Sequence, residues 1–452
     1  MLQYNFSLAL NSLKERPGLT FLMVLTIAVG LGLFTTIQTI SYYSSDIPIQ
    51  HKSQNIYLVT MDHRETSADP IERPTQMPDT TYKDVMNLIN APVPGVSYTI
   101  NWNSYGVINR DADTETAVRS EILVTDAAFF NMFETPFLYG GGWSSEADEK
   151  GDAVIVISRA MNDRLFGGID SVGQTIRVNT DTLTVVGVTK DWNITRRFYD
   201  RTYAPGYIHD FFVPTGYAIN SDIPRNENFD CWETEKEARF EFENDKWTQL
   251  INSECGWMRL WAAIPEGQLE GYESHLMRYI DPQKQLGRFP RDIKIVVDNI
   301  NEQIEFVAGR NGYINMFQMI AQLFFAVCLL NAIGIMLAKF IRRTKEVSLR
   351  RALGARKSVI IQQYVMEVVM VGILGGILGV IIAYFGLWGM LNIRLYAVDY
   401  TITAESIAHQ YQLNPLLIGQ AFLTSVACTL VVSLYPIWRI CNIPPASQLK
   451  SA

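Results

Sequence analysis

The chain has 452 residues, of which 48% are hydrophobic, and its formal net charge at pH 7 is −8. This length allows more than one domain. The Lys and Arg clusters lie beside long apolar runs, so the sequence shows no basic patch for binding nucleic acid and excludes that class of partner.

Four apolar segments are long enough to span a bilayer, which takes roughly 20 mostly apolar residues. We predict transmembrane helices at residues 18–43, 311–338, 363–393 and 410–438. The first segment runs uncharged for 25 residues and has no A-x-A cleavage pattern. We therefore expect it to be retained as an anchor and not cleaved as a signal peptide.

The segment before the first span, residues 1–17, carries Leu2, Phe6, Leu10 and Leu13 at helical spacing. This pattern favours an amphipathic cytoplasmic helix lying on the inner membrane surface. A plain extension of the first span is the alternative.

Charge is divided between the two sides of the membrane. The segments 1–17, 339–357 and 439–452 together hold twelve Lys and Arg and two acids, a net of +10, whereas the segments 43–310 and 394–409 total −17. Basic segments next to spans stay in the cytoplasm. We therefore place both termini and a loop at 339–362 inside, and the two acidic segments outside.

The long outer segment, 44–310, is expected to fold as a mixed α/β domain. Residues 152–157 and 182–188 are β-rich runs of the kind found in buried strands, and seven of the nine Trp lie in this segment. The fold class is therefore an α+β integral membrane protein, with four transmembrane helices and a large extracytoplasmic domain between the first and second.

Residues 346–356 read EVSLRRALGAR. This run resembles the cytoplasmic loop of FtsX/MacB-type ABC transporter permeases, where that loop meets the ATPase. Residues 124–133, 157–167, 172–176 and 185–188 resemble motifs of the MacB periplasmic core. No family motif is visible between about 193 and 290, where the resemblance implies an inserted subdomain.

The resemblance also implies function. The chain would be a permease subunit in the bacterial inner membrane that works with cytoplasmic ABC ATPase subunits and a second permease chain, identical or not. It would export substrates with a periplasmic adaptor and an outer-membrane channel. Lipoprotein extraction of the Lol type and FtsX-like regulation of an envelope hydrolase remain alternatives. The predicted ATPase-coupling residues are Glu346, Leu349, Arg350, Arg351, Leu353 and Gly354. Basic loops also contact lipid phosphates, which is the competing interpretation of the two arginines.

No catalytic, cofactor-binding or metal-binding residue is predicted. Residues 168–175 imitate a phosphate-binding loop, but Gln174 replaces the required Lys, so we interpret them as a turn. The five His form no metal-binding pair. ATP and Mg²⁺ are therefore expected on a separate ATPase chain.

Two further predictions concern cysteines and glycines. Cys231 and Cys255 are the only external cysteines, and an oxidising compartment would join them in a disulfide. In the third span, small residues at four-residue spacing allow close helix packing, either within the chain or against a second permease copy; they are Gly372, Gly375, Gly376 and Gly379. Glu367, at the start of this span, is expected at the cytoplasmic interface without a charged partner in the other spans.

Overall fold

The computed structural model of the chain describes residues 2–44, 47, 49–64, 79–110, 117–192, 197–200, 209–223, 246–291, 295–310, 313–397 and 408–442. The chain divides into two compact units. The membrane unit comprises Met1–Ser45 and Ala308–Ala452, and the outer unit comprises Asp46–Val307.

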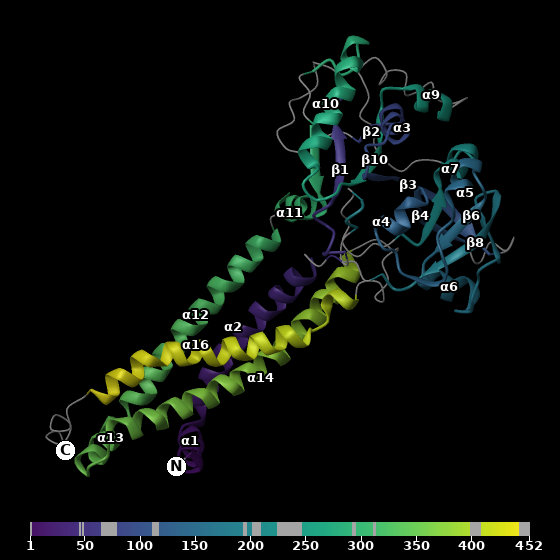
Figure 1. The fold of residues 1–452 in the computed structure, drawn as a ribbon. Helices are drawn as coiled ribbons and strands as arrows, with labels where there is room; N and C mark the ends of the chain where they lie inside the picture. Colours follow the sequence, from purple (N-terminus) through teal and green to yellow (C-terminus); the bar gives the residue numbers. More distant parts are fainter. Residues whose placement is uncertain are drawn as a thin grey trace. The chain divides into compact units, whose positions relative to one another are not determined.

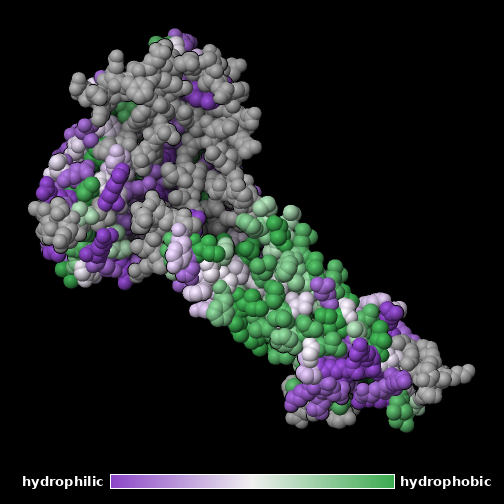
Figure 2. All heavy atoms as spheres, turned by 180° about the vertical axis from the view of Figure 1, so that it is seen from behind, coloured by the Kyte–Doolittle hydropathy of each residue, from purple (hydrophilic) through white to green (hydrophobic). Residues whose placement is uncertain are grey.

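The described part of the membrane unit is helical, as its uncharged runs predict. Its elements are α1 (Leu2–Glu15), α2 (Pro17–Ser44), α12 (Tyr313–Ile341), α13 (Thr344–Ala352), α14 (Lys357–Ala397), the 3₁₀ turn η4 (Ala408–Tyr411) and α16 (Pro415–Cys441). Four segments are long and apolar enough to cross a membrane. They are α2, α12, α14 and the segment Ala408–Cys441, which contains η4 and α16. The four predicted spans are therefore confirmed. Figure 1 shows the long helices running together, and Figure 2 shows hydrophobic residues over their surface.

The helices extend past the apolar runs. The third, α14, has 41 residues and begins at Lys357, so at 1.5 Å per residue it is about 60 Å long, roughly twice the hydrocarbon thickness of a bilayer. Similarly, α12 continues to Ile341 and includes Lys339. Lys and Arg are good helix formers, so the end of an apolar run does not mark the end of a helix.

In the described residues, the outer unit is built on one mixed sheet of eleven strands. Their bounds are β1 (Ile56–Met61), β2 (Thr80–Thr81), β3 (Ser97–Asn109), β4 (Val118–Thr125), β5 (Phe137–Gly140), β6 (Val154–Ile157), β7 (Thr175–Val178), β8 (Asp181–Thr189), β9 (Phe211–Pro214), β10 (Gly256–Ala263) and β11 (Ile295–Asn299). The main order is β11-β1-β10-β3-β4-β9-β6-β8-β5, with β2 paired to β10 and β7 paired to β3 and β8. Pairing is antiparallel except between β4 and β9 and between β6 and β8.

Helices lie between these strands and after the last one. They are α3 (Tyr82–Asn90), α4 (Ala128–Met132), α5 (Ser145–Lys150), α6 (Arg159–Phe166), α7 (Thr215–Asn220), α9 (Lys246–Asn252), α10 (Leu269–Gln285) and α11 (Ile300–Arg310). The sequence sets several of their ends. Ser158 caps α6 by accepting a hydrogen bond from the Met161 N–H, and Gly167 ends it with φ +69°.

The turn interpretation of residues 168–175 is confirmed. These residues connect α6 to β7, and Gly173 has φ +85°. A left-handed backbone at this point favours glycine on conformational grounds alone.

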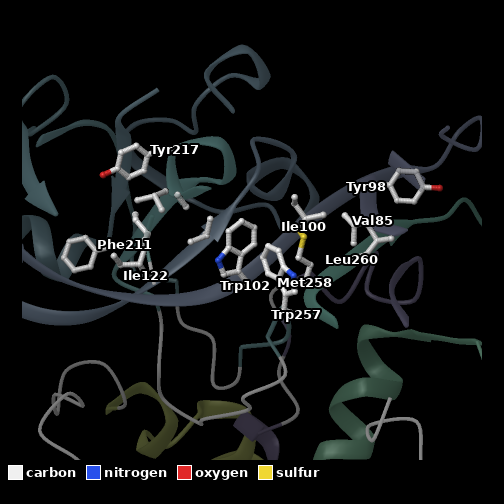
Figure 3. Close-up of a cluster of buried hydrophobic side chains, with 14 of the residues drawn as sticks. Val85, Tyr98, Ile100, Trp102, Ile122, Phe211, Tyr217, Trp257, Met258 and Leu260 are labelled. Atoms are coloured by element: carbon white, nitrogen blue, oxygen red, sulfur yellow. The ribbon is translucent and has the colours of Figure 1, made fainter. Parts of the chain in front are cut away.

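The sheet carries a hydrophobic cluster on each face. One includes Trp102 and Trp257, both fully buried, whose ring centroids are 5.1 Å apart in an edge-on arrangement (Figure 3). The other gathers Phe129, Phe133 and Trp261. Large aromatic side chains contribute much of the buried area in such a core.

An inserted subdomain was expected at about 193–290, and the strands described within this segment belong to the main sheet. Strand β10 lies inside the sheet, pairing with β1 on one side and β3 on the other. Strand β9 likewise joins β4 to β6. A segment without family motifs can therefore supply central strands, because pairing between distant strands leaves no local signature in the sequence.

Candidate coupling site

The predicted coupling segment forms α13, which connects α12 to α14 at one end of the membrane unit (Figure 1). One side of this helix is buried: Thr344, Val347 and Ser348 are each no more than 6% exposed. Val347 packs in the same cluster as Ile360 and Tyr364 of α14. The helix is therefore fixed to the membrane unit along one side and open along the other.

The open side carries two leucines. Leu349 is 52% exposed, and Leu353, just past the helix end, is 80% exposed. Gly354 follows with φ +98°, a backbone conformation that favours glycine, and it turns the chain toward α14. An exposed leucine pair beside a tight turn is a small apolar surface that a partner could cover.

The two arginines are less free than the sequence suggested. Arg350 donates to Gln363 of α14 over 3.0 Å and pairs with Glu346 over 2.5 Å. Arg351 donates to the main-chain oxygen of Cys441 over 3.1 Å. Both guanidinium groups therefore brace α13 against its neighbours, which the residue pattern alone did not reveal.

The expectation that Glu367 lacks a charged partner in the spans is wrong. Glu367 is 1% exposed and forms an ion pair with Lys339 of α12, which is fully buried. The Ser12 hydroxyl donates to Glu367 over 2.5 Å. Arg343, which directly precedes α13, is 3.9 Å from the same carboxylate. The partner was missed because Lys339 follows the apolar run and was assigned to a loop.

The N-terminal helix α1 is present, as predicted, and residues on one side of it pack against other helices of the membrane unit. Ala9, Ser12 and Leu13 are buried, whereas Leu10 is 38% exposed. Ser12 takes part in the charged network just described, which explains why a polar residue lies on the inner side.

All four predicted packing glycines face other helices of the same chain. A Cβ on Gly372 would lie 3.1 Å from Val426, and one on Gly376 would lie 3.3 Å from Phe422, both in α16. The other two, Gly375 and Gly379, face Ile27 and Leu31 of α2, where an added Cβ would come within 2.9 and 2.8 Å. These glycines therefore pack within the chain, and their contact with a second permease copy stays a prediction.

Of the predicted disulfide pair, Cys255 is buried and is disulfide-bonded. Cys231 lies outside the described residues, so its pairing with Cys255 stays a prediction.

The outer unit contains a buried cluster of charges. Asp200 accepts from Arg197 over 3.0 Å and from Arg259 over 2.7 Å, and all three residues are 1% exposed. Arg197 lies outside regular structure, whereas Arg259 belongs to β10, so the cluster fixes a connecting segment to the centre of the sheet. Among the described residues, no group of three or more His, Cys, Asp or Glu could hold a metal ion.

Comparison with known proteins agrees with this arrangement. Residues 20–226 match the MacB-like periplasmic core domain, and residues 319–445 match the FtsX-like permease C-terminal domain. The chain is 23% identical to the uncharacterized ABC transporter permease YvrN of Bacillus subtilis, covering 73% of this chain and 70% of that protein.

The chain spans about half of the length of another relative. The chain is 22% identical to the pyoverdine export ATP-binding/permease protein PvdT of Pseudomonas syringae, covering 82% of this chain but only 48% of the relative. Among solved structures, the periplasmic region of MacB from Actinobacillus actinomycetemcomitans aligns with 57% of this chain and 95% of that one, at 12% identity and a TM-score of 0.36.

The order of the two matched domains agrees with the structure. The MacB-like match covers most of the first span and much of the outer sheet domain, and the FtsX-like match covers the helices at the C-terminal end. The chain therefore belongs to the MacB/FtsX-type family of ABC transporter permeases.

Proposed function

We propose that this chain is the permease subunit of a MacB-like ABC transporter, which converts ATP hydrolysis on a separate cytoplasmic subunit into movement of the periplasmic domain. The movement would drive export. The relatives named for export, such as PvdT, are the basis for this choice. The ATPase subunits would hold ATP and Mg²⁺, and this chain would supply the mechanical link.

The exposed leucines of α13 are the observation that carries the proposal. Leu349 and Leu353 form an apolar surface beside a helix whose other side is packed against α14. A soluble partner could cover these leucines and press on α13, and the buried contacts would pass the force to α14. Helix-in-groove docking uses apolar anchors with this spacing.

The direction of insertion follows from charge. The segment 339–357 holds eight Lys and Arg and one acid, which favours the cytoplasmic side. With an even number of spans, both termini would lie in the cytoplasm and residues 46–307 in the periplasm. There the domain would meet an adaptor leading to an outer-membrane channel. Lipid and a second permease chain, identical or not, would cover the remaining exposed apolar helix surfaces.

Two alternatives keep the same architecture. A Lol-type transporter would extract lipoproteins from the membrane, and an FtsX-like scaffold would regulate an envelope hydrolase. The outer unit spans Asp46–Val307, and its part up to residue 226 matches the MacB-like core domain, which favours the MacB-like assignment over the FtsX-like one.

The test replaces Leu353 with Asp and leaves the arginines unchanged. We expect the ATPase to co-purify with the wild-type chain and to be lost from Leu353→Asp, because an added charge opposes burial of this site in the interface. Leu286→Asp is the matched control, since this leucine is 75% exposed and lies in the outer unit.

The same experiment separates docking from lipid anchoring. Lipid contact through the arginines predicts that Leu353→Asp inserts normally and retains the ATPase. Wild-type yield of the ATPase with this variant would refute the coupling assignment.

A further inference from the structure

One buried carboxylate lies where several helices of the membrane unit meet. Glu367 of α14 pairs with Lys339 of α12 and accepts from Ser12 of α1. Lys339 also donates to Thr20 of α2 over 3.1 Å. Helices α1 and α12 therefore connect to α14 through the Glu367 carboxylate, and α2 connects to it through Lys339.

The start of α13 is held by the same network. Arg343 donates to the Ser12 hydroxyl and, over 3.2 Å, to the Ser12 main-chain oxygen, and it pairs with Glu15. Its own main-chain oxygen accepts from the Val347 N–H over 3.0 Å, which closes the first turn of α13. A fixed Arg343 side chain therefore fixes the point from which α13 begins.

The surroundings of the network are apolar. Ala9 and Leu13 of α1, Phe340 of α12 and Tyr364 of α14 belong to one buried cluster, and the last two rings lie 4.5 Å apart. Charges in such a place cost desolvation energy, and an apolar pair would hold the helices at least as firmly. Ionisable residues kept within membrane helices usually serve function.

We propose that Glu367 is a positioning residue for the coupling helix. Through Ser12, Lys339 and Arg343 it ties α1, α2, α12 and the start of α13 to α14, so that a push on α13 moves these helix ends as one body. This inference deepens the proposed function, because it names the route by which force leaves α13. It adds α1 to the coupling machinery.

The positive and negative charges of the network are equal in number, and this balance determines which variants to compare. Two cations, Lys339 and Arg343, face two carboxylates, Glu367 and Glu15. Glu367→Gln keeps a carbonyl acceptor for Ser12 and leaves one excess buried positive charge. Adding Lys339→Met removes that excess, so the double variant restores the balance.

The first measurement uses the purified full chain without any ATPase. We expect Glu367→Gln to raise amide hydrogen exchange in α1 and α13 together, by about 3- to 30-fold, the range in which networked residues change coupling. Exchange in the outer unit stays at the wild-type rate. In the double variant both helices return toward wild-type exchange. Arg439→Gln, which removes an exposed charge from α16, is the control.

Two results would overturn the inference: exchange that rises in α1 without α13, or a double variant no better than Glu367→Gln. If Glu367→Gln does not fold, the double variant alone decides: its transport per ATP hydrolysed must still fall by about 3- to 30-fold, because it lacks the Glu367 carboxylate. Wild-type transport by the double variant would then overturn the inference.

The second measurement adds the ATPase. We expect Glu367→Gln to retain the ATPase, because the exposed leucines are untouched, while transport per ATP hydrolysed falls by about 3- to 30-fold. Unchanged transport per ATP would overturn the inference. An ATPase that fails to bind the wild-type chain would instead contradict the proposed function, so the two failures are distinguishable.

Discussion

Asp126 is expected to make the outer unit more stable at low pH. It follows β4 and accepts a hydrogen bond from the Thr99 hydroxyl. Part of the residue remains accessible, but burial of the carboxyl group raises its pKa to about 7, with a smaller contribution from the charge of Asp148. The Thr99 hydrogen bond opposes this rise.

The sign follows from proton binding. Between pH 4 and 7 the folded chain holds a proton on Asp126 that the unfolded chain has lost. The contribution of this group to the free energy of unfolding therefore falls as pH rises through that interval. A shift of about three pKa units corresponds to about 4 kcal/mol at most, of which roughly 2 kcal/mol is lost between pH 5.5 and 7.5. The pKa of Asp148, raised by burial to about 6, acts in the same direction.

Asp126→Asn removes the titration and keeps an acceptor for Thr99. We expect its gain in unfolding free energy over wild type to be roughly 2 kcal/mol larger at pH 7.5 than at pH 5.5. Urea unfolding of the full chain, followed by Trp fluorescence, measures this, since seven of nine Trp lie in 43–310. Asp152→Asn, at an exposed site, is the control. An equal gain at both pH values would refute the reasoning.

Two other variants test the packing. Gly379→Val should destabilise the membrane unit by about 1–3 kcal/mol, because the added Cβ would lie 2.8 Å from Leu31. Gly389→Val is the control and should not destabilise it, because its Cβ would have no atom within 4 Å. Thermal unfolding in detergent compares the two variants, and equal midpoints would contradict the packing account. Asp200→Asn should cost about 3–5 kcal/mol in the outer unit, because it removes the buried negative charge that Arg197 and Arg259 share. A loss below 1 kcal/mol in urea unfolding would show that these two ion pairs contribute little.

The parts of the structure that could be predicted are those with local signals. Uncharged runs of sufficient length located the four membrane helices, and the replacement of the required Lys by Gln174 identified residues 168–175 as a turn. The segment 346–356 was recognisable because its pattern is contiguous.

Features made by distant residues could not be predicted in this way. Ser12 and Glu367 are 355 positions apart and meet only in the folded chain. Lys339 lies just beyond an apolar run, where charge normally indicates the membrane boundary, yet it is buried. Strand β10 became central through pairing with β1 and β3, which no short motif encodes.

The most direct test of the account is whether ATP on the partner changes the outer unit through α13. Hydrogen exchange over residues 46–307 is measured in the assembled transporter with and without Mg·ATP. We predict an ATP-dependent change in the wild-type assembly that disappears when Leu353→Asp is present at the same ATPase concentration. No change in the wild-type assembly, or the same change in the variant, would contradict the proposed coupling.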